Sequence, residues 1–355
     1  MQNYDNHPAQ LHLKTLPVNE FLSQQPERVL LDVRTPGEYF QGHIPGALNL
    51  PLFTDAERAE VGTLYKQVSK EKAFLRGLDI AGAKLSHYIR EAMRMAPGRK
   101  VALHCWRGGQ RSGSLATLLA FSGFDVRILA GGYKAYRNHI LTTFSEKKLR
   151  LVVIGGKTGS GKTEILKALA DLGEQTIDLE ALARHKGSAF GALGEALQPT
   201  VEQFENDLFL LFDKMDTSRR VWVENESRSI GRVFIPQGFW EQMKSSPLLQ
   251  LEVPFEQRVN YLLAAYGAFP PEALMACLQK IQKRMGGQNV KEALEAFHQN
   301  DLATATAIAL RYYDKTYAHA TSKGNFSKIQ DIVVEKIAPA AMAHQLIEIA
   351  DANDL

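Results

Sequence analysis

The sequence has little cysteine and no long apolar run. Only two of its 355 residues are cysteine, Cys105 and Cys277, and they stand far apart, so a disulfide framework is not indicated. No apolar stretch is long enough to cross a bilayer, the first residues lack the blocks of a signal peptide, and no repeat or low-complexity tract occurs. With 45% hydrophobic residues, we expect an ordinary two-domain protein of the reducing cytoplasm, without a membrane partner.

Positive charge is unevenly distributed, although the net charge is only +3. Residues 84–150 contain thirteen Lys and Arg against three acidic residues, a local excess of +10. Such a block can attract a polyanion by neutralising phosphates and releasing counterions. It can equally be a solvated face with arginines at helix ends.

Apolar strands alternate with helical segments along most of the chain. Residues 28–34 read as a buried strand, residues 100–104 as a central strand and residues 123–129 as a turn and a strand, and residues 81–95 and 112–122 read as helices. This alternation predicts an α/β fold with covered parallel sheets, whose active loops lie at the carboxyl ends of the strands.

A cysteine begins a loop of glycines and arginines directly after the strand 100–104. The loop consists of Cys105, Trp106, Arg107, Gly108, Gly109, Gln110 and Arg111. Its backbone N–H groups and positive charge can favour the nucleophilic thiolate over the thiol. Cys277, in an apolar helical run, fits a buried core residue instead. Asp32 and Arg34 are interpreted as scaffold ions rather than catalysts.

A second strand, residues 149–154, leads into a phosphate-binding pattern. The P-loop pattern is matched at every fixed position by Gly156, Lys157, Thr158, Gly159, Ser160, Gly161, Lys162 and Thr163. Here glycines let backbone amides approach phosphate oxygens, Lys162 can reach the terminal phosphates, and Thr163 is placed to ligate Mg²⁺.

Acidic residues end two later strands and are candidates for chemistry beside the P-loop. Asp178 follows one strand, and Glu224 and Glu226 end another. They could hold Mg²⁺-bound water, act as a base or begin helices. No Asn-Lys-x-Asp sequence, which would recognise guanine, follows the P-loop, and no adenine site is evident. The pyrophosphate group of a molecule other than a nucleotide is therefore a candidate ligand.

From about residue 255 the sequence becomes helical, with amphipathic runs over 255–266, 271–285 and 290–300. Two groups in this region could contact RNA, by charge and by stacking on an unpaired base. They could also be a solvated face and a packed helix. The groups are Lys280, Lys283 and Arg284, and Tyr313 and Tyr317.

The motifs of the first domain, predicted over residues 1–145, resemble the rhodanese family. The resemblance rests on residues 31–34, residues 42–47 and the Cys105 loop, in that order. It implies that Cys105 carries a transferred chalcogen as a persulfide or its selenium equivalent, held by the loop N–H groups. The second domain is predicted over residues 146–355 as a P-loop NTPase-like α/β domain with a helical C-terminal extension.

Over nearly its full length the chain resembles the tRNA 2-selenouridine synthase family, in which a rhodanese domain is fused to a P-loop domain. Beyond the two loops, residues 178–180, 224–228 and 313–317 carry this resemblance. It implies conversion of wobble 2-thiouridine to 2-selenouridine through an S-geranyl intermediate, with Cys105 and Lys162 as catalytic residues. Geranyl diphosphate and selenophosphate would be substrates, with Mg²⁺ but no tightly bound cofactor, and the partners would be a tRNA anticodon stem-loop and a selenophosphate supplier.

Two other functions stay open. The chain could be a sulfurtransferase fused to an ATP-dependent kinase or adenylating domain that acts on RNA. It could also be a regulatory RNA-binding protein whose P-loop is a nucleotide switch and whose cysteine senses oxidation. The first requires ATP turnover, and the second predicts RNA affinity without any base modification.

Overall fold

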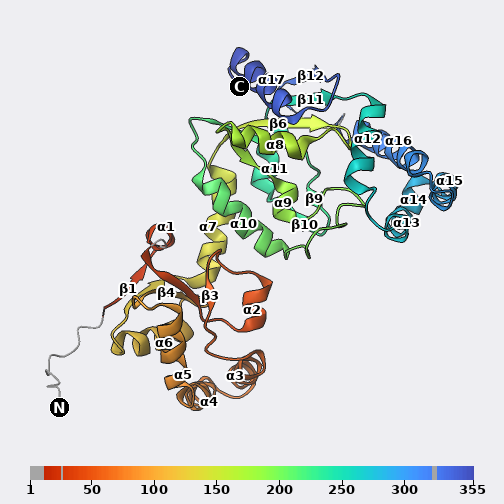
Figure 1. The fold of residues 1–355 in the computed structure, drawn as a ribbon. Coiled ribbons are helices and arrows are strands. Elements are labelled where there is room, and N and C mark those ends of the chain that lie inside the picture. The colour runs from red at the N-terminus through yellow and green to blue at the C-terminus, as the bar shows by residue number, and fades with distance from the viewer. Residues whose placement is uncertain (1–11, 25–26, 322–325) are drawn as a thin grey trace. The chain divides into compact units, whose positions relative to one another are not determined.

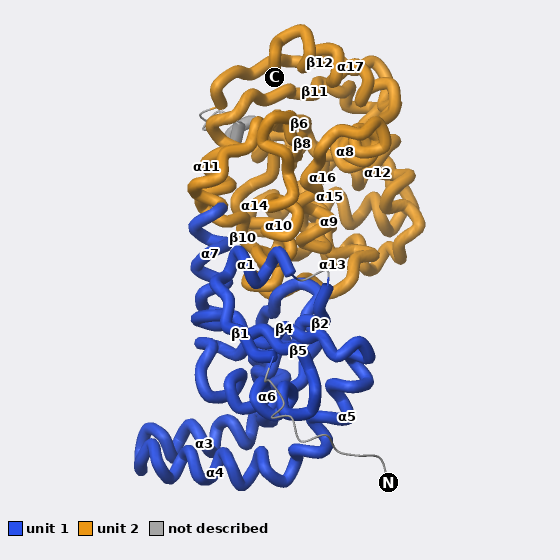
Figure 2. The backbone as a smooth tube through the Cα atoms, turned by 90° about the vertical axis from the view of Figure 1, so that its left-hand side faces the viewer, with its two compact units in different colours: residues 1–143 blue, residues 144–355 orange. Residues whose placement is uncertain are grey.

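The structure, a computed structural model, describes residues 12–24, 27–321 and 326–355. The chain divides into two compact units, residues 1–143 and residues 144–355 (Figure 2). Each unit is built on a five-stranded parallel sheet with helices around it (Figure 1). The predicted α/β fold class is therefore confirmed.

The sheet of the first unit has the strand order β1-β5-β4-β2-β3, and every neighbouring pair is parallel. Its strands are β1 (Leu13–Leu16), β2 (Val29–Asp32), β3 (Leu48–Asn49), β4 (Lys100–His104) and β5 (Asp125–Leu129). β4 lies at the centre, and its buried Val101 and Leu103 share a core with Leu115 and Leu119. Because β4 is central and buried on both faces, the loop that follows it starts from a rigid base.

The helices of the first unit are α1 (Val18–Ser23), α2 (Pro36–Gln41), α3 (Asp55–Gln67), α4 (Lys70–Gly82), α5 (Leu85–Met95) and α6 (Gln110–Phe121). The sequence predicted the last two, with boundaries shifted by a few residues. It did not predict α3 and α4, two packed helices between β3 and β4. α7 (Gly132–Glu146) begins in the first unit, and its last residues belong to the second.

The sheet of the second unit has the order β12-β11-β6-β8-β7 and is also parallel. Its strands are β6 (Arg150–Gly156), β7 (Gln175–Ile177), β8 (Arg220–Glu224), β11 (Leu248–Glu252) and β12 (Ile329–Val333). A short hairpin is formed by β9 (Ser229–Ile230) and β10 (Val233–Phe234). Because β8 is the direct neighbour of β6, the acids at the end of β8 lie beside the P-loop.

The other elements around this sheet are α8 (Lys162–Asp171), α9 (Leu179–Ala183), α10 (Val201–Lys214), α11 (Gln237–Ser245) and α17 (Pro339–Ala352). α8 follows the P-loop, and its Ile165, Leu166 and Leu169 pack into the same core as α17. The helix after the P-loop is thus buried along one side, which fixes its first turn.

Five further helices form what we call the helical annex: α12 (Phe255–Tyr266), α13 (Pro271–Lys280), α14 (Gln282–Met285), α15 (Gly287–His298) and α16 (Leu302–Thr321). The annex has its own core, centred on Leu278, Val290 and Ala293. The helix predicted over 271–285 is interrupted at Ile281, which lies between α13 and α14 with φ −102° and ψ 6°. No helix within the described ranges is both long and apolar enough to cross a membrane.

Candidate functional site

The cysteine loop, residues 105–111, connects the carboxyl end of β4 to α6. Cys105 is only 3% exposed, and its Sγ lies 3.2 Å from the Ser112 Oγ. The backbone of α7 holds the loop from behind, because the N–H of Tyr133 donates to the Cys105 carbonyl at 2.8 Å. A Cβ on Gly132, whose φ is +62°, would lie 2.4 Å from that carbonyl oxygen. Only glycine fits this close approach, so α7 fixes the position of the cysteine.

Hydrogen bonds and charge activate the thiol of Cys105. Burial by itself raises its pKa, but the Ser112 hydroxyl, the N–H groups of Ser112 and Arg107, and the charge of Arg111 lower it by more. The net pKa lies below the ordinary value for cysteine. Since the thiolate is the nucleophile, the loop favours the reactive form.

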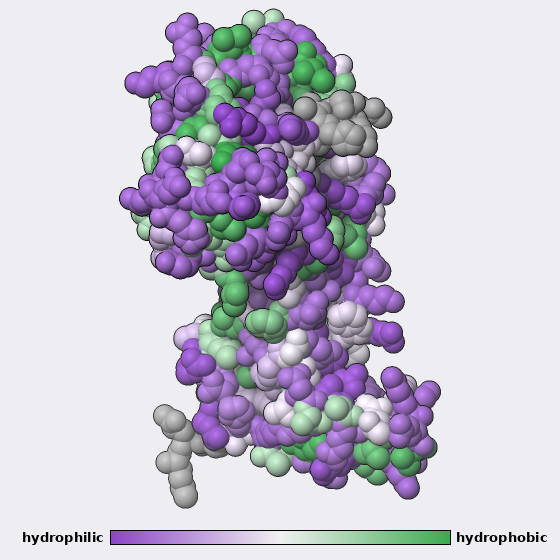
Figure 3. Space-filling view, turned by 90° about the vertical axis from the view of Figure 1, so that its right-hand side faces the viewer, coloured by the Kyte–Doolittle hydropathy of each residue, from purple (hydrophilic) through white to green (hydrophobic). Residues whose placement is uncertain are grey.

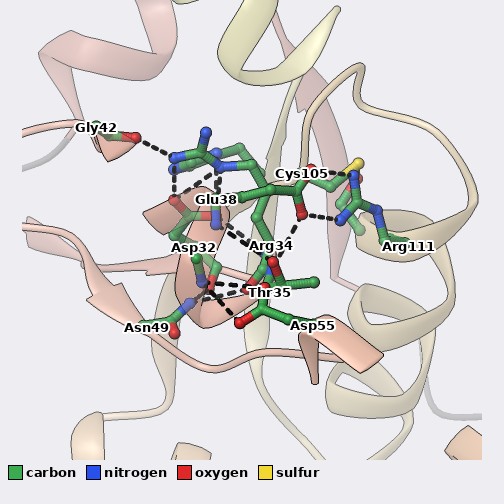
Figure 4. Close-up of polar contacts among 12 residues, drawn as sticks. Asp32, Arg34, Thr35, Glu38, Gly42, Asn49, Asp55, Cys105 and Arg111 are labelled. Carbon is green, nitrogen blue, oxygen red and sulfur yellow. Dashed lines mark hydrogen bonds and ion pairs between the residues drawn. The ribbon is translucent and has the colours of Figure 1, made fainter. Parts of the chain in front are cut away.

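Arg111 is held in place by Glu38 (Figure 4). Its Nη1 donates to Glu38 Oε2 at 2.5 Å and its Nη2 to Oε1 at 3.1 Å. The same Oε2 accepts the N–H of Thr35 at 3.0 Å, which caps α2. Arg107 is exposed and forms no ion pair with a residue that the structure describes, so it is the loop cation with the most freedom to meet an anion.

Asp32 and Arg34 form a buried ion pair behind the loop, as the sequence predicted for scaffold ions. Arg34 Nη2 donates to Asp32 Oδ2 and to the Gly42 carbonyl, both at 2.6 Å. Its guanidinium also lies 3.7 Å from the ring centroid of Tyr133. These contacts tie α2 and the start of α7 to the sheet, and they leave the pair no access to a substrate.

The P-loop follows β6 and is shaped by glycines. Gly159 and Gly161 have φ of +84° and +76°, a conformation that favours glycine. Lys162 begins α8, and its Nζ donates to the Gly156 carbonyl at 3.1 Å. The lysine therefore folds back across the loop, over the concave side where a phosphate binds.

The helical annex contacts the backbone of the P-loop. The Arg258 Nη1 donates to the Thr158 carbonyl at 3.2 Å, and the guanidinium forms a two-pronged ion pair with Asp314, both contacts 2.8 Å long. Arg258 is buried. A buried, fully paired arginine between α12 and α16 makes the annex part of the P-loop's support.

Three carboxylates gather beside Lys162, and we call them the carboxylate cluster: Glu180, Glu224 and Glu226. One oxygen of each lies within 4.8 Å of the others. Glu224 is 0% exposed, and its Oε1 accepts the N–H of Glu180 at 2.9 Å. Its Oε2 has no hydrogen-bond partner among the described residues. Thr163 of the P-loop joins the group, because its Oγ1 donates to Glu180 Oε2 at 3.1 Å.

Burial and mutual repulsion disfavour the charged forms of the carboxylates in this cluster. Burial, together with repulsion from Glu226, raises the pKa of Glu180 to about 7. Burial raises the pKa of Glu224 well above its ordinary value as well, and its carboxylate neighbours add to the effect. The pKa of Lys162 is raised as well, because the surrounding carboxylates outweigh burial, and for a lysine this favours the charged form. A hard divalent cation would neutralise this repulsion and give the buried Glu224 oxygen a partner, so the residues present fit Mg²⁺.

The sequence selected Glu224 and Glu226 but not Glu180. Asp178, which it did select, caps α9, where its Oδ1 accepts the N–H of Ala181 at 2.8 Å. Glu180 could have been identified from its position two residues after the capping Asp178. This position puts it in the first turn of α9, beside the end of β8. A catalytic or Mg²⁺-water role for Asp178 stays a prediction.

The residues predicted to contact tRNA lie in the annex. Lys280 ends α13, and Lys283 and Arg284 are exposed on α14. The hydroxyl of Tyr313 accepts the N–H of Ala189 at 3.0 Å, and that of Tyr317 accepts the N–H of Gly156 at 2.8 Å. The tyrosine hydroxyls thus have partners within the protein, and contact of these five residues with tRNA stays a prediction.

Known proteins resemble the chain over both units. A family model described as the tRNA 2-selenouridine synthase AAA domain matches residues 149–344, and a rhodanese-like domain model matches residues 18–139. A protein of Bdellovibrio bacteriovorus named tRNA 2-selenouridine synthase is 36% identical over 89% of this chain and 82% of its own length. A protein of the same name from Shewanella denitrificans is 34% identical, over 87% and 92% of the two chains. Another from Cupriavidus necator is 40% identical, over 67% and 65%.

Proposed function

The chain belongs to the tRNA 2-selenouridine synthase family, a family named for tRNA modification, and from this premise we propose that it replaces the sulfur of wobble 2-thiouridine in tRNA by selenium. The proposed route has two steps, with S-geranyl-2-thiouridine as the intermediate. One observation carries the proposal: a single chain holds a cysteine of lowered pKa and a P-loop whose lysine lies among three carboxylates. The first suits chalcogen transfer, and the second suits departure of a diphosphate.

The first step is alkylation of the thiocarbonyl sulfur. The sulfur attacks C1 of geranyl diphosphate, the C–S bond forms, and the C–O bond breaks so that diphosphate leaves with the electron pair. Lys162 and the P-loop amides face the growing negative charge of the leaving group, where preorganised donors lower the barrier. The proton of the base nitrogen is lost, so that the alkylated base is neutral. No nucleotide is hydrolysed.

The second step exchanges the alkylated sulfur for selenium. A thiocarbonyl sulfur leaves poorly, whereas the alkylated sulfur can depart as geranylthiol once selenium has added to the same carbon. Selenophosphate supplies the selenium, and its phosphoryl group is released to water. Cys105 positions the selenium of the donor, which stays at the selenide oxidation level, and Arg107, with Arg111, holds the anionic donor by charge-assisted hydrogen bonds.

Mg²⁺ is the ion that we assign to the carboxylate cluster and Thr163. When bound, it supplies positive charge next to the diphosphate. The residues themselves set the site: Glu224 orients the first turn of α9 through the N–H of Glu180, and Thr163 fixes the Glu180 carboxylate. Lys162 keeps its proton because carboxylates surround it.

The test is mass spectrometry of nucleosides from a tRNA that carries 2-thiouridine, incubated with the full-length protein and Mg²⁺. With geranyl diphosphate alone we expect S-geranyl-2-thiouridine, and with selenophosphate added we expect 2-selenouridine. Neither product should depend on ATP. If both products are absent without ATP, the P-loop serves a kinase or adenylating reaction and the proposal fails. If the RNA binds but no base is modified under any condition, the regulatory alternative replaces it.

A further inference from the structure

The helical annex contains a cavity of about 780 Å³ that the proposed chemistry does not use. It opens between α14, α15 and α16, next to the first residue of α12. Its volume is in the range of about 300–1,000 Å³ typical of small-ligand sites. The face that carries α15 and α16 is mostly hydrophilic, with small hydrophobic patches between the polar residues (Figure 3).

The rim of this cavity is cationic. Arg284, Arg311 and Lys315 line it, all three are exposed, and none forms an ion pair with another residue in the described ranges. Of the two acids in the lining, Asp314 is neutralised by its two-pronged pair with Arg258. The remaining acid, Glu292, accepts a hydrogen bond from the Gln288 side chain at 2.9 Å. The cavity therefore has an excess of positive charge that the protein itself leaves uncompensated.

Aromatic and apolar side chains form the rest of the lining. Phe255 and Tyr312 are half-buried, and the Arg311 guanidinium lies 5.5 Å from the Phe255 ring centroid. Met285 and Ile308 add apolar surface. An aromatic wall beside unpaired cations is the combination that single-stranded nucleic acids recognise, because the bases stack and the phosphates pair.

α16 connects this cavity to the P-loop. Residues 308, 311, 312 and 315 line the cavity, whereas Tyr317 of the same helix binds the N–H of Gly156. Asp314 belongs to both regions, since it lines the cavity and pairs with the arginine that binds the Thr158 carbonyl. One helix thus presents one set of residues to the diphosphate site and another to the cavity.

We infer that this cavity binds a single-stranded nucleotide of the substrate RNA, with its base against Tyr312 and Phe255 and its phosphate on Arg284, Arg311 and Lys315. The inference rests on the proposed function, and it names the surface in the annex that holds the RNA near the P-loop. A prenyl chain is the competing occupant, because part of the lining is apolar. It would leave all three cations unused, whereas a nucleotide uses both kinds of lining.

The experiment measures the affinity of the full-length protein for a synthetic anticodon stem-loop RNA with 2-thiouridine at the wobble position, by fluorescence anisotropy at several salt concentrations. We expect Arg284→Ala and Lys315→Ala each to weaken binding about threefold or more and to lower the salt slope by about 1. Tyr312→Ala should weaken binding at least about fivefold, while Tyr312→Phe keeps the stacking surface and the affinity. Lys291→Ala is the matched control, since Lys291 is an exposed cation of α15 that does not line the cavity.

Three results would overturn the inference. Lys291→Ala could weaken RNA binding as much as Arg284→Ala, which would make the contact a general basic face. The cavity variants could retain RNA affinity, or they could lose affinity for geranyl diphosphate in calorimetry instead, which would assign the cavity to the prenyl chain. Since RNA affinity is measured without any reaction, failure of the proposed chemistry would appear separately, as wild-type protein that binds the RNA without modifying it.

Discussion

Tyr317 of α16 accepts a hydrogen bond from the backbone N–H of Gly156, the last residue of β6, at 2.8 Å. Its hydroxyl in turn donates to the Oε1 of Gln250, a buried residue of β11, at 2.9 Å. The two residues are 161 positions apart in the sequence. A side chain from the annex therefore fixes the first residue of the P-loop, so the annex helps to position the phosphate-binding site.

We expect Tyr317→Phe to lower the free energy of unfolding by about 1–2 kcal/mol, because it removes the partner of a buried N–H group. Urea unfolding of the variant and the wild type at the same pH measures this difference. Tyr312→Phe is the control on the same helix, since the Tyr312 hydroxyl has no hydrogen bond with a residue that the structure describes. Equal stability of Tyr317→Phe and wild type would show that the contact contributes nothing.

Ser112→Ala should raise the pKa of Cys105, because it removes the side-chain hydrogen bond to Sγ. A hydrogen bond to a charged group is worth about 1.5 kcal/mol, so alkylation by iodoacetamide at neutral pH should slow about tenfold. The measurement uses a Cys277→Ser background, which leaves one thiol. Ser114→Ala, an exposed serine of the same helix, should leave the rate unchanged. An unchanged rate in Ser112→Ala would contradict the account.

Glu38→Gln should shift the pKa of Cys105 in the opposite direction. Arg111 lowers that pKa through its charge, and Glu38 compensates part of this charge. Neutralising Glu38 leaves the positive charge of Arg111 stronger at the sulfur, so the thiolate should persist to lower pH. The pH at which alkylation reaches half its maximal rate is the readout. A rise of this midpoint would mean that the main role of Glu38 is to position Arg111 rather than to compensate its charge.

Glu224→Gln should distinguish what the carboxylate cluster contributes to Mg²⁺ binding from its effect on the stability of the metal-free protein. Because burial and neighbouring carboxylates raise the pKa of Glu224, its charged form costs free energy in the folded state. In EDTA we therefore expect the variant to be more stable than the wild type by about 1 kcal/mol or more. In Mg²⁺ the wild type should gain stability and the variant should not.

Asp301→Asn is the control for this comparison, because Asp301 lies outside the carboxylate cluster and asparagine can also accept the capping hydrogen bond at the start of α16. It should keep the Mg²⁺-dependent gain in melting temperature. If Mg²⁺ stabilises Glu224→Gln as much as the wild type, the cluster does not hold the ion.

The sequence predicted those parts of the fold that depend on local patterns. The strand 100–104, the helix 255–266 and both loops lie where alternation, periodicity and motif spacing placed them. α3 and α4 were missed because few core positions mark them: α3 buries none of its side chains, and α4 buries only Ala73 and Ile80. The break at Ile281 was missed because the flanking residues are all compatible with a helix.

The site was only partly predictable, for a physical reason. Motifs identify residues that act near one another in the sequence, such as Cys105 with its loop. Glu180, Arg258 and Tyr317 reach the P-loop through sheet neighbours and annex packing. Such contacts depend on the order of strands and on the positions of α12 and α16, and no local pattern encodes these.

The most direct test of the central claim is a bypass experiment, in which each loop is disabled and the intermediate is supplied. Lys162→Ala, given geranyl diphosphate and thiolated tRNA, should form little S-geranyl-2-thiouridine, yet it should convert pre-geranylated tRNA to 2-selenouridine when selenophosphate is present. Cys105→Ala should form the S-geranyl nucleoside and stop there. Lys167→Ala on the exposed side of α8 and Cys277→Ser in α13 are the matched controls and should complete both steps. If Lys162→Ala fails on pre-geranylated tRNA, or if Cys105→Ala fails at alkylation, the two loops do not divide the reaction and the account is contradicted.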